Sequence, residues 1–77
     1  MTLQPCTWQQ VVAALRRCGV EVVKENDDHV FMARMPSIKA ISKRGLVPTA
    51  IQKDLIVTFG LLAVDYLSYL PEAPTVH

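Results

Sequence analysis

The sequence has 77 residues, about half of them apolar, with eight basic and seven acidic side chains and a net charge of +1. A chain of this length forms one hydrophobic core, and its apolar content argues against disorder. We therefore expect a single domain over residues 1–77, with an ordered core from about residue 6 to 70 and a flexible tail over 71–77. A dedicated nucleic-acid binder is usually much more basic, so any such activity must depend on a local patch.

The two cysteines, Cys6 and Cys18, flank the first predicted helix. Twelve residues of helix span about 18 Å, which is too far for a disulfide. No second cluster of cysteine and histidine completes a zinc site, so we expect no metal and no cofactor. Free thiols and the lack of a signal peptide predict a cytoplasmic protein. The apolar run 55–70 is short for a membrane span and contains Asp65, so we expect no membrane insertion.

A helix is predicted over residues 7–18. Thr7 can cap its first turn, and Gln10, three residues later, completes a capping box. Gly19 can adopt the left-handed conformation that commonly ends a helix. The apolar residues that recur at helical spacing on one face, and that we expect to pack in the core, are Trp8, Val11, Val12, Leu15 and Cys18.

Two short segments, 20–24 and 29–35, are predicted to pair as an antiparallel hairpin. The first is rich in β-branched residues. The second alternates, with Val30 and Met32 on one face and the residues between them on the other. The intervening sequence ENDD, residues 25–28, is typical of a turn, because Asn and Asp bond their own main chain.

The segment 37–45, which follows Pro36, admits two interpretations. Ile38 and Ile41 are three residues apart and suit one turn of helix. The sequence SIKAI suits a short third strand equally well.

Helical sequence follows Pro48, which suits the first position of a helix. Gly60 either ends this helix or lies inside a longer one, because an interior glycine costs only about 1 kcal/mol. The residues expected on one face of the first stretch are Ile51, Leu55 and Phe59. Those expected on one face of the second, over 61–70, are Leu62, Tyr66 and either Tyr69 or Leu70.

The expected order is therefore a helix, a hairpin with or without a third strand, and one or two helices. This order predicts an α+β domain with its helices on one face of a small antiparallel sheet. A core this small leaves apolar surface outside it, so we also expect a homo-oligomer or a complex with another protein.

Most catalytic signatures are missing from the sequence, including a Gly-rich phosphate loop, a nucleophile elbow and a close Cys–His pair. Within the expected core, His29 alone titrates near neutral pH. At a strand start beside a polar turn, it would be accessible to solvent and able to act as a general acid or base. Metal-independent RNA cleavage requires little more, since the 2′-hydroxyl of the substrate is the nucleophile. A histidine in this position is more often an ordinary surface residue.

The order of motifs around His29 favours a catalytic role for it. In VVAALRRCGVEVV a helix, a glycine and a strand follow one another, and His29 lies ten residues after Gly19. LVPTAIQKDLIVTFGL and then AVDYLSYL look similar to a proline-started helix followed by a short last helix. Over residues 7–70 this pattern resembles the HicA family, mRNA interferase toxins with a fold similar to the double-stranded-RNA-binding domain. The resemblance implies a metal-independent endoribonuclease with His29 as its catalytic residue and a cognate antitoxin as its partner.

The chain departs from the family pattern on both sides of His29. Asp27 and Asp28 replace the family's Gly-Ser, and carboxylates there would repel a phosphate backbone. Val30 replaces the family's second histidine. A degenerate relative, with the architecture but without the chemistry, is the other interpretation of the resemblance.

The basic residues that can gather beside the hairpin, and hence the candidate RNA-binding residues, are Lys24, Arg34, Lys39, Lys43 and Arg44. The alternative function is that of a small phage- or plasmid-type regulator or inhibitor that binds a host protein through its apolar C-terminal helix. Its candidate partner-binding residues are Leu62, Tyr66 and Tyr69. A DNA-binding regulator ranks last, because only VPTAIQKD could begin a recognition helix.

Overall fold

The computed structural model describes residues 3–70, and the tail predicted to be flexible, 71–77, lies outside them. Within residues 3–70 the chain forms three helices and five strands. In chain order these are β1 (Cys6–Thr7), α1 (Trp8–Arg17), β2 (Glu21–Glu25), β3 (His29–Arg34), β4 (Ser37–Ser42), β5 (Leu46–Val47), α2 (Thr49–Thr58) and α3 (Ala63–Tyr69).

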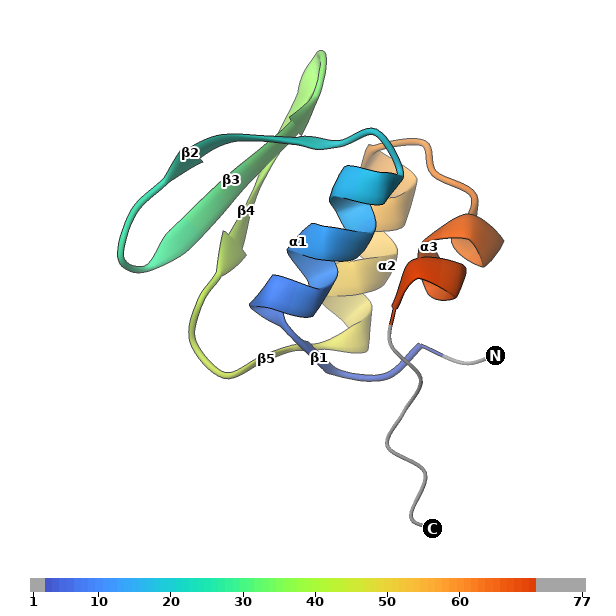
Figure 1. Ribbon diagram of the computed structural model, residues 1–77, viewed down its shortest axis with the longest axis horizontal. Coiled ribbons are helices and arrows are strands. Elements are labelled where there is room, and N and C mark those ends of the chain that lie inside the picture. Colours follow the sequence, from blue (N-terminus) through green and yellow to red (C-terminus); the bar gives the residue numbers. More distant parts are fainter. Residues whose placement is uncertain (1–2, 71–77) are drawn as a thin grey trace, which may run out of the picture.

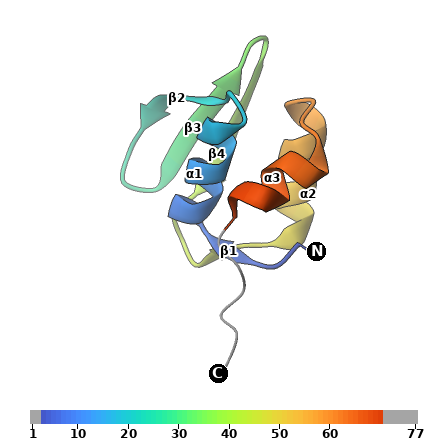
Figure 2. The ribbon, with the colours of Figure 1, turned by 45° about the vertical axis from the view of Figure 1, so that its right-hand side comes forward.

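The predicted α+β class is confirmed (Figure 1). Strands β2, β3 and β4 form an antiparallel sheet with β3 in the centre, and β1 pairs with β5 in a separate two-stranded ladder. Figure 2 shows α1 between this sheet and the other two helices. All three helices therefore lie on one side of the sheet.

The hydrophobic core fills the space between the sheet and the helices. Val30, Met32 and Ile41 point into it from β3 and β4, because strand residues two apart share a face. The helices contribute most of the other buried side chains, among them Val11, Leu15, Leu55 and Tyr66, and Phe59 adds one at the C-cap of α2. Trp8 packs against this cluster but is only partly buried.

Helix α1 begins and ends as the sequence predicts. Thr7 is its N-cap, and its hydroxyl accepts a hydrogen bond from the Gln10 backbone N–H at 3.2 Å. The Gln10 side-chain oxygen accepts one from the Thr7 N–H at 3.0 Å, which completes the capping box. Gly19, with φ of +91°, follows the C-cap Cys18 and turns the chain into β2.

The first hairpin of the sheet has a local cause. The side-chain oxygen of Asn26 accepts hydrogen bonds from the backbone N–H groups of Asp28 and His29, at 2.9 and 2.8 Å, which fixes the turn between β2 and β3. Of the two interpretations of 37–45, the strand is correct for Ser37–Ser42, because β4 pairs with β3 along its whole length.

The C-terminal part contains two helices, since Gly60 adopts φ of +64° and separates α2 from α3. Two details differ from the sequence prediction. Pro48 is the N-cap of α2 and not its first helical residue. Ile51 is exposed, and Gln52 takes the expected place of Ile51 in the core.

Gln52 can be buried because its side chain is fully hydrogen-bonded. Its Nε2 donates to the backbone oxygens of Gln4 and Val47, at 2.8 and 3.1 Å. Its Oε1 accepts a hydrogen bond from the Tyr66 hydroxyl at 2.8 Å. One polar side chain thus connects the N-terminal segment, β5, α2 and α3. None of the helices in the described part of the chain is long and apolar enough to cross a membrane.

Candidate functional site

The face of the three-stranded sheet that points away from the helices is uncovered, and we call it the open face. Cross-strand partners share a face, so the register of the sheet defines its members. They are Glu21, Lys24, His29, Phe31, Ala33, Ile38, Ala40 and Ser42. Four of its eight side chains are apolar, and Lys24 and His29 lie at the end of the face where β2 turns into β3.

His29 is exposed on the open face, at the first residue of β3. Its backbone N–H is held by Asn26, so the start of the strand is fixed by the turn before it. The centroid of its ring lies 6.2 Å from that of Phe31, and the two rings are tilted by 44°. The sequence prediction of an accessible His29 agrees with this placement.

Phe31 is the neighbour of His29 that the sequence did not single out. It is half-buried, and the Lys24 ammonium of the adjacent strand lies 5.8 Å from the centre of its ring. This distance permits a cation–π contact. The alternation of β3 places Phe31 opposite to Val30 and Met32, and that pattern was the available signal for an exposed aromatic ring. Lys24, His29 and Phe31 therefore form one contiguous group.

The other predicted RNA-binding residues do not join this group. Arg34, at the far end of β3, donates from Nη1 to the backbone oxygen of Phe59 at 3.1 Å. Lys39 points to the helix side of β4, where its ammonium lies 3.0 Å from Asp54. Both side chains thus connect the sheet to the end or the exposed side of α2.

Lys43 and Arg44 follow β4 and lie near the turn before His29, but both meet carboxylates. The Lys43 ammonium is 2.6 Å from Glu25 and lies 4.8 Å from the centre of the Trp8 ring. The Arg44 guanidinium is 3.4 Å from Asp28 in a pair whose side chains are mostly exposed. These carboxylates reduce the positive potential available to a phosphate, so Lys24 is the cation best placed beside His29.

The predicted partner-binding residues are separated by the fold. Tyr66 is completely buried beneath α3, so the prediction that it contacts a partner is wrong. Its ring fills the core because α3 lies across α1 and α2 with this residue inward. Leu62 is 66% exposed, and Tyr69 is partly exposed beneath the Arg17 guanidinium, 5.0 Å from its ring centre.

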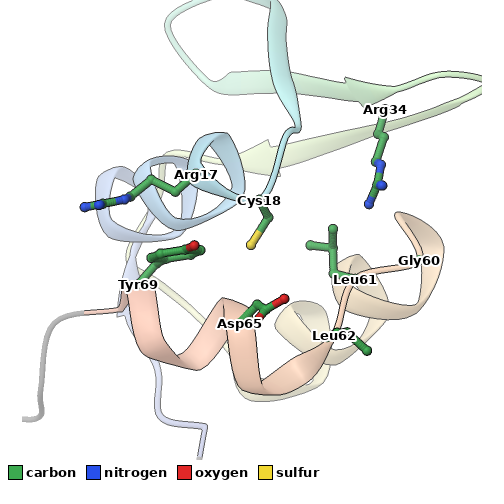
Figure 3. Close-up of a pocket in the computed structure, with 8 residues that line it drawn as sticks. All are labelled: Arg17, Cys18, Arg34, Gly60, Leu61, Leu62, Asp65 and Tyr69. Carbon is green, nitrogen blue, oxygen red and sulfur yellow. The ribbon is translucent and has the colours of Figure 1, made fainter.

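Leu62 and Tyr69 border a cavity of about 310 Å³ between the end of α1, the start of α3 and the Gly60 turn (Figure 3). The Cys18 sulfur and the Asp65 carboxylate face its interior, while Arg17 extends over Tyr69 and away from it. Burial raises the pKa of the Cys18 thiol, and Asp65 raises it further against a smaller opposite effect of Arg34. The thiol therefore stays protonated at neutral pH and is a poor nucleophile.

A second, apolar groove of about 560 Å³ lies between α2 and α3. Its lining residues are Leu3, Thr49, Lys53, Ile56, Val57, Ala63 and Leu67. Val57 and Val64, on the helices that border it, are 79% and 63% exposed. Five of the seven residues that line the groove are apolar.

Nothing in the described part of the chain gathers three or more metal-ligating side chains. Cys6 and Cys18 are both free thiols.

No protein-family model, no curated protein and no solved structure matches this chain. The fold and the open face define a structural class only. The molecule is a small α+β domain with three helices on one face of its main sheet and a histidine, a phenylalanine and a lysine together on the other.

Proposed function

We propose that the domain is a HicA-like RNA-binding protein that holds single-stranded RNA on its open face. The observation that carries this function is the grouping of Lys24, His29 and Phe31 on a sheet surface that no helix covers. Over residues 7–70, α1, the three strands of the main sheet, α2 and α3 follow one another in the order that the HicA resemblance predicts, with the short β5 as an addition before α2.

The geometry suits an unpaired nucleotide better than a duplex. An exposed aromatic ring on a sheet can stack on a base of any sequence, with a free energy of about 1–3 kcal/mol per base. Phe31 provides such a ring, and Lys24 beside it can contact the adjoining phosphate. The five candidate basic residues do not line a long groove, so the footprint is short.

His29 is the group on this surface that can transfer a proton. In the proposed cleavage, the substrate 2′-hydroxyl attacks the adjacent phosphorus while its proton passes to the imidazole. The P–O5′ bond breaks, and the departing 5′-oxygen takes a proton from solvent. The imidazole then releases the proton it accepted to solvent. The products are a 2′,3′-cyclic phosphate and a 5′-hydroxyl end. Lys24 is the cation that can steady the charge on the phosphate.

The test is expression in bacteria of the wild-type chain, His29→Ala and, as a control on an exposed residue of α1 away from both surfaces, Gln9→Ala. The wild type and the control should slow growth and shorten transcripts, whereas His29→Ala should do neither. Equal growth and intact transcripts in all three strains would rule out the ribonuclease and leave RNA binding to be tested separately.

A second function is favoured by the apolar surface of α2 and α3. Val57, Leu62 and Val64 are each more than half exposed, and Val57 lines the groove between the two helices. Such a surface suits a regulator that binds another protein through an apolar helix. If this is the function, Val64→Lys should abolish the cellular effect of the chain while His29→Ala leaves it intact.

A further inference from the structure

Strand β4 is an open edge of the main sheet. The strand order β2-β3-β4 leaves two edges, and natural proteins usually protect such edges with bulges, prolines or charges. The β2 edge is interrupted by a bulge between Val22 and Lys24. In contrast, β4 pairs with β3 without a bulge, and its six residues include no proline. Among the described residues β4 has no strand on its other side.

The hydrogen bonds to β3 show which backbone groups of β4 point outward. The Lys43 N–H donates to the Asp28 backbone oxygen at 2.9 Å, so these two residues form a hydrogen-bonded pair. Hydrogen-bonded and non-bonded pairs alternate along antiparallel strands. The N–H and C=O groups that are directed to the free edge are therefore those of Ile38, Ala40 and Ser42.

The side chains of β4 do not obstruct this edge. Ile38, Ala40 and Ser42 are uncharged and belong to the open face. Lys39, the only charged residue of the strand, lies on the helix side, where Asp54 holds it at 3.0 Å. A second strand can therefore approach without displacing a charged side chain.

We propose that β4 pairs antiparallel with β4 of a second copy of this chain and so forms a two-fold symmetric dimer. This inference is independent of RNA binding. The two open faces then lie on the same side of one continuous six-stranded sheet, because residues that share a face must pair with one another. We infer that the strand pairing with this edge comes from a second copy, because β4 is complementary to itself in one register.

That register places Ala40 opposite Ala40 of the second copy. Ile38 then pairs with Ser42 in both directions, and about six new backbone hydrogen bonds form, two for each bonded pair. Lys39 lies opposite Ile41 of the second copy. If the two-fold axis passed through Lys39, the two Lys39 side chains would lie opposite each other, and like charges directly opposite are destabilising. One hydrogen-bonded pair would also be lost. A shift to Ile41 would also lose a bonded pair.

The first test is sedimentation equilibrium of wild type, Ala40→Pro and Ala40→Val over a range of concentrations. Ala40 directs its N–H to the free edge, so proline removes one interface hydrogen bond for each copy of the dimer and none within the monomer. Circular dichroism checks that the variant is folded. Wild type and Ala40→Val should dimerise with rising concentration, and Ala40→Pro should remain monomeric. A wild type that stays monomeric throughout would overturn the proposal.

The second test locates the interface and does not depend on the folding of the proline variant. Ala40→Cys should form a disulfide-linked dimer on mild oxidation, because bonded partners lie about 5.5 Å apart between Cα atoms. Mass spectrometry should show that the disulfide joins the two introduced thiols, one from each copy. Lys53→Cys, on the exposed side of α2, is the matched control and should not form such a dimer. A dimer that lacks the link between the introduced thiols, or that Val64→Lys dissociates, would place the contact on the helices and overturn the proposal.

Discussion

The hydroxyl of Tyr66 donates a hydrogen bond of 2.8 Å to the side-chain oxygen of Gln52, and both residues are completely buried. Tyr66 is the central residue of α3, and Gln52 bonds the N-terminal segment and β5. This pair therefore fixes the last helix against the rest of the fold.

The pair predicts a large effect for the loss of one hydroxyl. Tyr66→Phe should lower the free energy of unfolding by about 1–3 kcal/mol, because it leaves the buried Gln52 oxygen without a donor. Tyr69→Phe removes a hydroxyl from a partly exposed ring and should change stability by less than about 0.5 kcal/mol. Urea denaturation of both variants measures the difference. Equal effects would contradict the role assigned to the pair.

Tyr66 also predicts how stability depends on pH. Burial raises its pKa well above the ordinary value of 10.0, so the folded state keeps the phenol protonated where the unfolded chain ionises. The contribution of the protonated phenol to the free energy of unfolding is fully present below pH 10 and is lost as the pH rises beyond it. Cys6, whose pKa burial also raises from 9.0, adds a loss that begins above pH 9.

Urea midpoints at several pH values between 7 and 11 measure this dependence. The wild type should weaken steeply above pH 10, and Tyr66→Phe should weaken less over the same interval. Parallel curves for the two proteins would show that Tyr66 does not control the alkaline limit.

The capping box of α1 gives a third prediction. Thr7→Ala removes the acceptor of the Gln10 N–H and should cost about 1 kcal/mol of stability, whereas Thr7→Ser keeps it and should cost little. Gln9→Ala, at an exposed position of the same helix, is the control. Thermal unfolding of the three variants distinguishes them, and a Thr7→Ala protein as stable as Gln9→Ala would contradict the cap.

Gly60 gives a prediction about the backbone alone. A Cβ atom at this residue would meet nothing within 4 Å, so the effect of Gly60→Ala comes from its φ of +64°. The left-handed conformation should cost alanine about 1–2 kcal/mol. Gly60→Asn should cost less, since asparagine tolerates it better. Similar losses for both variants, measured by urea denaturation, would mean that steric or packing changes dominate.

Much of the fold was predictable because its determinants are local. Thr7, Gln10 and Gly19 specify the limits of α1, and ENDD specifies the first turn. The strand over 37–42 was ambiguous, because Ile38 and Ile41 fit a helix until the long-range pairing with β3 decides between them. Gln52 was missed because only the tertiary partners Gln4, Val47 and Tyr66 make its burial favourable.

The candidate site was less predictable than the fold. The exposure of His29 follows from its place after a polar turn. The ion-pair partners of the lysines could not be predicted in this way, because the carboxylates that pair with Lys39 and Lys43 come from distant parts of the sequence. Tyr66 and Leu62 share a helical stripe in the sequence, yet the short α3 buries one and exposes the other.

Because most of the candidate basic residues already pair with carboxylates, we expect RNA affinity to depend only weakly on salt concentration. With Lys24 as the main phosphate contact, the slope of log K against log salt concentration should be near −0.7, the value for about one phosphate of a single strand. Lys24→Ala should flatten the slope towards zero. A slope several times steeper would show that the other cations leave their carboxylates and bind phosphates.

Binding of a labelled single-stranded RNA, followed by fluorescence anisotropy, tests the open face most directly. The variants are Phe31→Ala and, as a matched control, Val57→Ala on the opposite side of the domain. The wild type and the control should bind with equal affinity, and Phe31→Ala should bind at least about fivefold more weakly, as expected for the loss of one stacked base. Equal affinity for all three proteins, or no binding by the wild type at low salt, would contradict an RNA-binding open face.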